Sequence, residues 1–240
     1  MCLLAVANRC IPGVRVLIAA NRDEFFVRPT APAGRWHNGL VGGRDLKAGG
    51  GWLLLRPGGG FAALTNIRRP EYMLPSAGPS RGHLVVDGAR ALDAEAFVRA
   101  VARSEYAGFN LLVEDRDALW VVGTDTAPRR VTPGVHGLSN ATIDAPWPKT
   151  QALCAVVRQH GHDPEALFTA LRNPDRAPDA ALPHTGVPLD LERGLSAAFV
   201  RLPGYGTRVS TVAWIHDDGR WGFIERRYSS QGEVAETRLS

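Results

Sequence analysis

Lysine is scarce in this 240-residue chain: only Lys47 and Lys149 occur, although Lys and Arg together number 28. The basic residues are therefore almost all arginines, and they lie dispersed among 24 acidic residues without any run longer than two. A nucleic-acid-binding surface gathers its basic residues into a patch interleaved with aromatic side chains. The dispersed pattern argues against nucleic acid as a partner, while arginines near a pocket would favour an anionic small molecule.

Cysteine is also scarce. Cys2, Cys10 and Cys154 form neither a CxxC pair nor an even, closely spaced set, which argues against a zinc site and a disulfide framework. The longest apolar runs, such as the one ending at Ala20, fall far short of the ~20 residues that a membrane-spanning helix needs. The first residues also lack the basic region of a secretory signal. We therefore expect one cytoplasmic domain over residues 1–240 without a membrane span.

Hairpin patterns alternate with helical ones. Apolar, β-branched stretches at 3–7 with 14–21, 52–55 with 61–66, 109–113 with 119–123, and 209–215 with 221–228 predict paired strands. A further strand is expected at 135–140. Helical periodicity marks 81–89, 93–103, 164–171 and a stretch that follows Pro148 and is closed by Gly161. A proline-rich stretch at 173–189 predicts a long loop of the kind that often covers a site. Hairpins with segregated helices predict an α+β fold.

Cys2 raises the first chemical question, because it directly follows the initiator Met1. If an aminopeptidase removes Met1, Cys2 carries both a thiol and a free α-amine. An α-amine titrates near ~7.7 to 8.0, so it can accept the thiol proton at neutral pH without a histidine partner. The alternative is that Cys2 is simply an apolar strand residue.

Other catalytic patterns are weaker. The segment Gly137-Leu138-Ser139-Asn140-Ala141 lacks the final glycine of a serine nucleophile elbow. The two triple-glycine segments are not followed by the GK[ST] of a phosphate-binding loop, so we interpret them as turns. His160 and His162 flank Gly161 beside Asp163, a pattern more typical of helix capping than of a metal site.

At Asn21-Arg22-Asp23-Glu24 the chain carries the tetrapeptide that names the NRDE proteins. Further matching segments are GGRD at 42–45, ALTN at 63–66, PSRG at 79–82, GFNL at 108–111, GLSN at 137–140 and YGTR at 205–208. Together these motifs identify the chain as a member of the NRDE family, also called the transport and Golgi organisation protein 2 family.

The family resembles the N-terminal nucleophile hydrolases, which implies a four-layer αββα sandwich of two antiparallel sheets. The nearest pattern is that of the choloylglycine hydrolases and penicillin V acylases. That resemblance implies a nucleophilic Cys2, an adjacent Arg22, oxyanion donors Asn66 and Asn140, and an Arg208 that holds the thiolate or a substrate carboxylate. The reaction would be hydrolysis of a non-peptide C–N amide bond, for which no cofactor is required.

One departure concerns the acidic residue that orients the amine. The acylases place an aspartate three residues after the arginine, whereas Asp23 follows Arg22 immediately, so Asp23 and Glu24 are both candidates. Structural interpretations also stay open. Asn66 and Asn140 are typical turn residues, and Arg22 could form a buried ionic brace with Asp23, Glu24 or Asp45.

The resemblance allows a second function, because family members have been linked to haem movement and acyl-lipid or acyl-coenzyme A metabolism. In this alternative the chain is a carrier with an apolar cleft, and haem is its ligand. His83 and His136 are then the conceivable axial ligands. The aromatic residues that would line the cleft are Trp36, Trp52, Phe61, Trp147 and Trp214.

Overall fold

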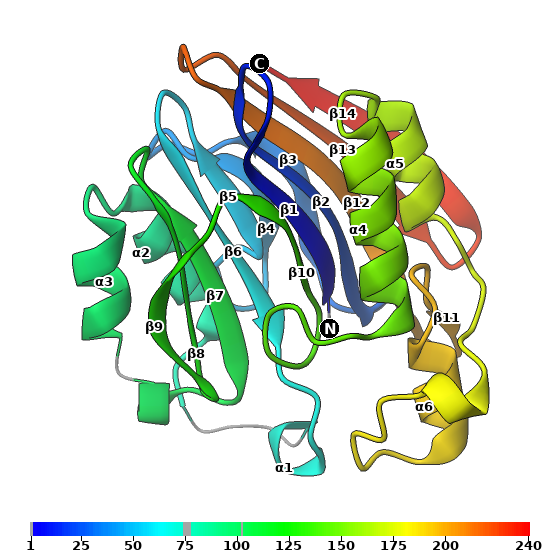
Figure 1. Ribbon diagram of the computed structural model, residues 1–240. Coiled ribbons are helices and arrows are strands. Elements are labelled where there is room, and N and C mark those ends of the chain that lie inside the picture. Colours follow the sequence, from blue (N-terminus) through cyan, green and yellow to red (C-terminus); the bar gives the residue numbers. More distant parts are fainter. Residues whose placement is uncertain (1, 74–77, 102) are drawn as a thin grey trace.

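The computed structural model describes residues 2–73, 78–101 and 103–240, and two antiparallel sheets dominate it (Figure 1). Sheet A has the strand order β10-β1-β2-β12-β13-β14, and β11 pairs with β12. Its strands are β1 (Cys2–Ile11), β2 (Val14–Phe25), β10 (Gly134–Leu138), β11 (Arg201–Leu202), β12 (Tyr205–His216), β13 (Trp221–Ser229) and β14 (Gly232–Leu239). The first and last segments of the chain therefore belong to the same sheet.

Sheet B follows the chain order without a crossover, from β3 to β9. Its strands are β3 (Thr30–Arg35), β4 (Val41–Asp45), β5 (Leu53–Arg56), β6 (Gly60–Asn66), β7 (Phe109–Glu114), β8 (Leu119–Gly123) and β9 (Thr126–Val131). Each neighbouring pair in this sheet is antiparallel.

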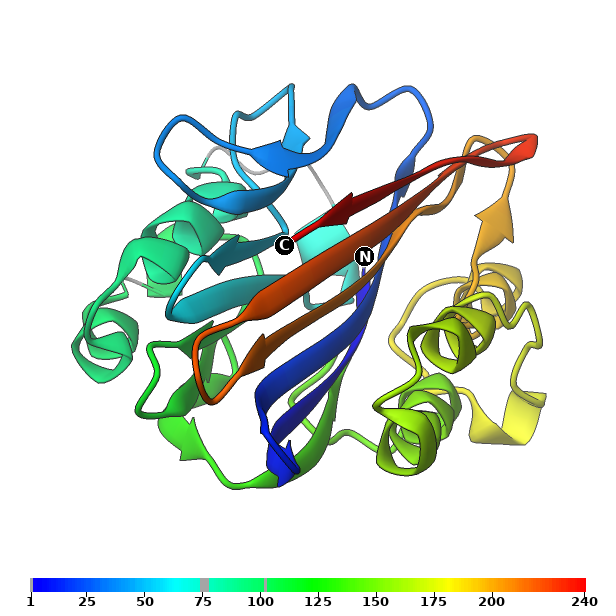
Figure 2. The same cartoon turned by 90° about the horizontal axis from the view of Figure 1, so that it is seen from above.

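Helices cover the outer face of each sheet, as Figure 2 shows from above. Sheet B carries α2 (Arg81–Arg90) and α3 (Ala94–Ala100), and sheet A carries α4 (Pro148–His160) and α5 (Pro164–Leu171). Shorter elements are α1 (Pro70–Met73), α6 (Leu189–Leu195) and the 3-10 turns η1 (Arg103–Glu105) and η2 (Asp179–Ala181). The predicted α+β class with two antiparallel sheets flanked by helices is confirmed.

The core consists of one apolar layer between the sheets and one under each helix pair. Side chains alternate along a strand, so Leu4 and Val6 enter the layer between the sheets while Leu3 and Ala5 pack under α4 and α5. Both faces of β1 are thus buried. This explains why its sequence is a continuous apolar run rather than an alternating one.

The paired strands predicted from apolar runs are present, and α5 has the expected bounds. Strand β10 ends at Leu138 rather than Asn140, because the chain bends at Ser139. Helix α6 was not predicted, since it begins within the proline-rich stretch. The edge strands β3, β9 and β14 were missed because they lack the apolar, β-branched runs that mark a buried strand.

The strand register fixes what surrounds the start of the chain. The Cα of Cys2 lies opposite the Cα of Arg22, and Leu4 lies opposite Leu138. Asn140 follows Leu138 by two residues, as Cys2 precedes Leu4 by two, so both leave the β1–β10 ladder at the same end. Along the described ranges, no helix is long and apolar enough to span a membrane.

Candidate functional site

Three candidate residues line one cavity of about 130 Å³ at the end of the sandwich where β1 begins. These are Arg22 and Asp23 of β2 and Asn66 at the end of β6. We call this the site cavity; its other lining residues include Glu24, Trp52 and Arg81. The Cα of Cys2 lies opposite that of Arg22, and Met1, on whose removal the role of Cys2 as nucleophile depends, lies outside the described residues.

The NRDE tetrapeptide divides its side chains between the two faces of β2. Asn21 is buried and donates hydrogen bonds to the carbonyl oxygens of Leu171 and Ala198, at 2.8 Å each. It also accepts a 2.6 Å hydrogen bond from the hydroxyl of Ser210. Asn21 therefore ties β2 to α5 and to the chain that precedes β11. The catalytic prediction did not include it, and its role is structural.

Arg22 is 6% exposed and reaches across to sheet B. Its guanidinium stacks on Trp52, 4.6 Å from the ring centroid, and forms ion pairs of 3.6 Å with Glu24 and 3.9 Å with Asp45. The ionic brace that the sequence left open thus joins Arg22 to Glu24 and Asp45. Arg28 shares the same partners, with its Nη2 at 2.6 Å from Asp45 Oδ2. Although burial acts to raise the pKa of Asp45, Arg28 lowers it below its ordinary value overall.

Asp23 and Glu24 have different surroundings. Asp23 is 1% exposed; its Oδ1 accepts a 2.6 Å hydrogen bond from the Thr207 hydroxyl, and its backbone oxygen accepts one from Tyr205. Glu24 is partly exposed. Its carboxylate forms ion pairs with Arg22 and Arg28 and accepts a hydrogen bond from the neighbouring backbone N–H. Of the two acidic candidates, Asp23 is therefore the buried one, and Glu24 is the one engaged by two arginines.

Asn66 and Asn140 are joined directly. The Asn140 side-chain amide donates a 2.8 Å hydrogen bond to the backbone oxygen of Asn66. Asn140 is 2% exposed, so this bond is shielded from water. Across the part of the chain that the structure describes, the Asn66 side chain has no hydrogen-bond partner. Asn140 thereby fixes the chain at Asn66.

Arg208 lies beside the site cavity without lining it. Its Nη1 donates to the backbone oxygens of Phe25, Phe26 and Arg28, at 2.9 to 3.2 Å, and its guanidinium stacks on Phe26. Burial and the positive charge of Arg22 lower the pKa of Arg208. Arg208 thus holds in place the segment between β2 and β3, which includes Arg28. Arg208 itself lies within electrostatic range of Arg22.

Two buried residues near the site were missed from the sequence. Arg68 is 2% exposed, stacks on Trp147 at 4.8 Å and pairs with Glu192 of α6 at 3.0 Å. Glu225 of β13 is fully buried between the sheets and accepts a 2.7 Å hydrogen bond from the Ala33 backbone. Burial raises the pKa of Glu225 to about 7. Arg68 follows Asn66 closely in an Arg-Arg pair that is typical of exposed surface, so the sequence carried no signal of its burial.

Gly43 explains how Trp52 comes to lie between Glu225 and Arg22. A Cβ at Gly43 would stand 2.2 Å from the Trp52 ring and 3.1 Å from Glu225 Oε2. Only glycine leaves room for the indole at this position of the strand. The second glycine of the GGRD motif is therefore required for the platform under Arg22.

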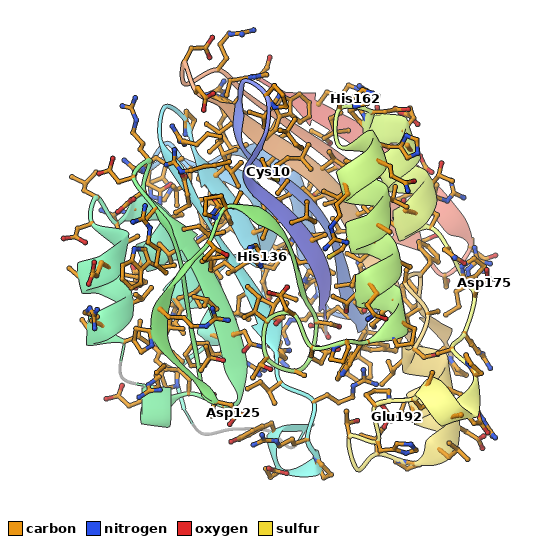
Figure 3. The ribbon with its side chains drawn as sticks, viewed as in Figure 1. Cys10, Asp125, His136, His162, Asp175 and Glu192 are labelled. Atoms are coloured by element: carbon orange, nitrogen blue, oxygen red, sulfur yellow. The ribbon has the colours of Figure 1, made fainter. Side chains whose placement is uncertain are left out.

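The proposed haem ligands are engaged elsewhere. Both ring nitrogens of His136 are in hydrogen-bond contact, with Asp144 at 2.8 Å and the Thr132 carbonyl at 3.0 Å, and Figure 3 shows His136 on β10. His83 Nε2 contacts the Ala48 carbonyl. Within the described residues, no three His, Cys, Asp or Glu side chains are grouped to hold a metal ion.

The predicted aromatic cleft residues lie in different parts of the molecule. Trp52 lines the site cavity, Trp147 contacts Arg68, and Phe61 is fully buried between the sheets. Trp36 packs on the layer under α2 and α3, and Trp214 packs on the layer under α4 and α5. The aromatic side chains therefore do not mark a common cleft.

Comparison with known proteins agrees with the motifs. The family model described as Transport and Golgi organisation 2 matches residues 1–230. The Transport and Golgi organization protein 2 homolog of Homo sapiens is 33% identical over 242 residues, covering 88% of this chain and 86% of its own length. The corresponding proteins of Mus musculus and Drosophila melanogaster are 32% and 27% identical, covering 88% and 94% of this chain and 86% and 91% of their own lengths. The chain therefore belongs to the Transport and Golgi organisation 2 family.

Proposed function

We propose that this protein is a cysteine amidohydrolase whose nucleophile is Cys2 after removal of Met1. The observation that carries the proposal is the pairing of Cys2 with Arg22, since Arg22 lines a cavity together with Asp23 and Asn66. The order helix, sheet, sheet, helix supports it, because N-terminal nucleophile hydrolases share that layering. A cytoplasmic location would keep the thiol reduced.

In the proposed reaction the Cys2 sulfur attacks the amide carbonyl carbon, and its α-amine takes the thiol proton. The same amine then donates that proton to the leaving nitrogen as the C–N bond breaks. A water molecule, activated by the amine, hydrolyses the resulting thioester. The Asn66 amide donates to the oxyanion, while Asn140 fixes the Asn66 backbone through its 2.8 Å hydrogen bond.

Charge near the nucleophile supports this division of roles. Arg22 would lower the thiol pKa, because a neighbouring cation favours the thiolate. Asp23 would orient the ammonium from its buried position, held by Thr207. Arg208 would act indirectly, by holding the connection between β2 and β3.

The lining of the site cavity bears on the acyl group, and its volume is about 130 Å³. Trp52 and Leu64 are its apolar walls, and arginines and carboxylates form much of the rest. A short acyl chain with a polar substituent fits this lining better than a long fatty acyl chain.

Replacement of Cys2 by Ala should abolish hydrolysis, since it removes the attacking atom. The experiment is a screen of short acyl amides with the Met1-trimmed protein, measuring amine release for the wild type, Cys2→Ala and Cys10→Ala. Cys10 is exposed on the same strand and serves as a matched control. Hydrolysis that persists in Cys2→Ala, or a trimmed wild type inactive across the screen, would refute the proposal.

A further inference from the structure

A second cavity, of about 460 Å³, lies beside the site cavity at the same end of the sandwich. We call it the Arg68 cavity; its lining includes Arg68, Asn140, Trp147, Pro183, Thr185 and Gly186. The Asn140 amide that donates to Asn66 connects the two cavities. Figure 3 shows Asp125, which also lines this cavity, and Glu192, the partner of Arg68, at the lower end of the molecule.

Arg68 uses only part of its donor capacity. Its Nη1 donates to Glu192 at 3.0 Å, whereas Nε and Nη2 are buried and have no hydrogen-bond partner among the described residues. These two nitrogens are the side-on fork of a guanidinium, whose parallel N–H groups match the two oxygens of a carboxylate. A buried donor without a partner is unfavourable, because it has lost its hydrogen bonds to water. An acceptor that filled the fork would restore that hydrogen bonding.

The loop at 183–186, which lines the Arg68 cavity, is held by Glu192, the ion-pair partner of Arg68. Thr185 donates to Glu192 from its backbone N–H at 2.8 Å and from its hydroxyl at 2.9 Å. The neighbouring His184 has a φ of 52°, in the left-handed region that a side chain rarely adopts. Gly186 packs against Pro70, with φ at 86°. Strained backbone fixed by buried hydrogen bonds is characteristic of ligand-binding loops.

Arg68 lies within electrostatic range of two buried acids, Glu192 and Asp23. Lys149, a second buried cation, donates to the Leu195 carbonyl of α6, one turn from Glu192.

We propose that the Arg68 cavity binds a carboxylate on the substrate, received by the Nε and Nη2 fork of Arg68. The inference rests on the proposed function and names its substrate class: amides whose short acyl chain carries a carboxylate. The fork is shielded from solvent, so a carboxylate reaches it only when part of the cavity lining moves. Trp147 then forms the wall behind the guanidinium.

The test is isothermal titration of the Cys2→Ala protein with succinamate and with its neutral counterpart, succinamide. Succinamate should bind about tenfold more tightly or better, because a paired charge-assisted hydrogen bond exceeds a neutral one. Arg68→Gln alone would leave Glu192 buried without its cation and could unfold the loop. The double variant Arg68→Gln/Glu192→Gln removes both charges and should bind the two compounds equally.

Arg69→Gln is the matched control, because Arg69 lines the same cavity but is exposed and paired with Asp125. It should retain the preference for succinamate. Equal affinities in the Cys2→Ala protein, no binding of succinamate, or a preference that survives in the double variant would overturn the proposal. The titration requires no thiol, so its outcome is separate from that of the hydrolysis screen.

Discussion

Replacement of Glu225 by Gln is expected to raise the free energy of unfolding by about 3 kcal/mol near about pH 8. Glu225 is fully buried, and burial raises its pKa from 4.5 to about 7, a change that the Ala33 N–H and the charges of Arg227 and Arg22 only partly oppose. Its Oε2 has no hydrogen-bond partner within the described ranges. The ionised carboxylate is therefore the unfavourable form in the folded protein.

The sign of the pH dependence follows from the two pKa values. Below pH 4.5 the Glu225 carboxyl is protonated in both the folded and the unfolded protein, so its ionisation does not reduce stability. Between pH 4.5 and about 7 only the unfolded chain loses the proton, so wild-type stability falls as the pH rises through this window. Glutamine keeps the oxygen that accepts the Ala33 hydrogen bond but cannot ionise. The stability of Glu225→Gln should therefore vary less with pH.

Urea denaturation across this pH range measures the effect directly. Glu236→Gln, on the neighbouring strand β14, is the control, because hydrogen bonds from Arg226 lower the pKa of Glu236 instead. Loss of the Glu236 carboxylate should lower the free energy of unfolding at pH values above the pKa of that carboxyl. It should leave unchanged the pH dependence of stability that Glu225 causes. A Glu225→Gln variant with the wild-type slope would contradict the assignment. The result bears on the candidate site, because Glu225 and Trp52 both lie next to Gly43 and Glu225 is within electrostatic range of Arg22.

Arg15→Met is expected to destabilise the protein by about 3–5 kcal/mol at neutral pH. Arg15 and Glu114 are 4% and 2% exposed, and their 2.8 Å ion pair joins β2 of sheet A to β7 of sheet B. Burial already raises the pKa of Glu114 despite the opposing charge of Arg15. Without Arg15, the carboxylate must be buried alone or take up a proton.

The double variant Arg15→Met/Glu114→Leu should recover most of that stability, because apolar side chains of similar size can replace a buried ion pair at little cost. Thermal unfolding of the two single variants and the double variant forms a complete cycle. The decrease in the free energy of unfolding caused by Arg15→Met should also become smaller toward acidic pH, where Glu114 is neutral. A double variant less stable than either single variant would show that the pair itself stabilises the fold.

Much of the fold could be predicted because buried strands have continuous apolar sequences. Strand β1 is apolar on both faces, and the Asp-Gly turn at 218–219 marks the hairpin of β12 and β13. The edge strands β3, β9 and β14 gave no such signal, since their outer residues face water. Helix α6 was hidden for a similar reason: its first turn is acidic and exposed, and only Glu192 and its last residues are buried.

For the candidate site, the sequence could name residues but could not show that they act. Arg22, Asp23 and Asn66 line one cavity, and the Asn140 side chain donates to the Asn66 backbone. The partners of Arg22 could only be narrowed to three acids, because side-chain direction at a strand end depends on the opposite sheet. Arg68, Glu192 and Glu225 were missed because burial of a charged residue depends on distant segments that cover it.

The central claim is that the thiol and α-amine of Cys2 act together in the folded protein. Its most direct test is the rate of Cys2 alkylation by iodoacetamide, followed by peptide mass spectrometry, in chains with and without Met1. Cys154, whose pKa burial raises to about 11, and Cys10, whose pKa burial also raises, are internal references. We predict alkylation about tenfold faster in the trimmed chain near neutral pH, with most of that advantage lost in urea. Equal rates in the two folded chains, or an advantage that persists undiminished after unfolding, would contradict the account.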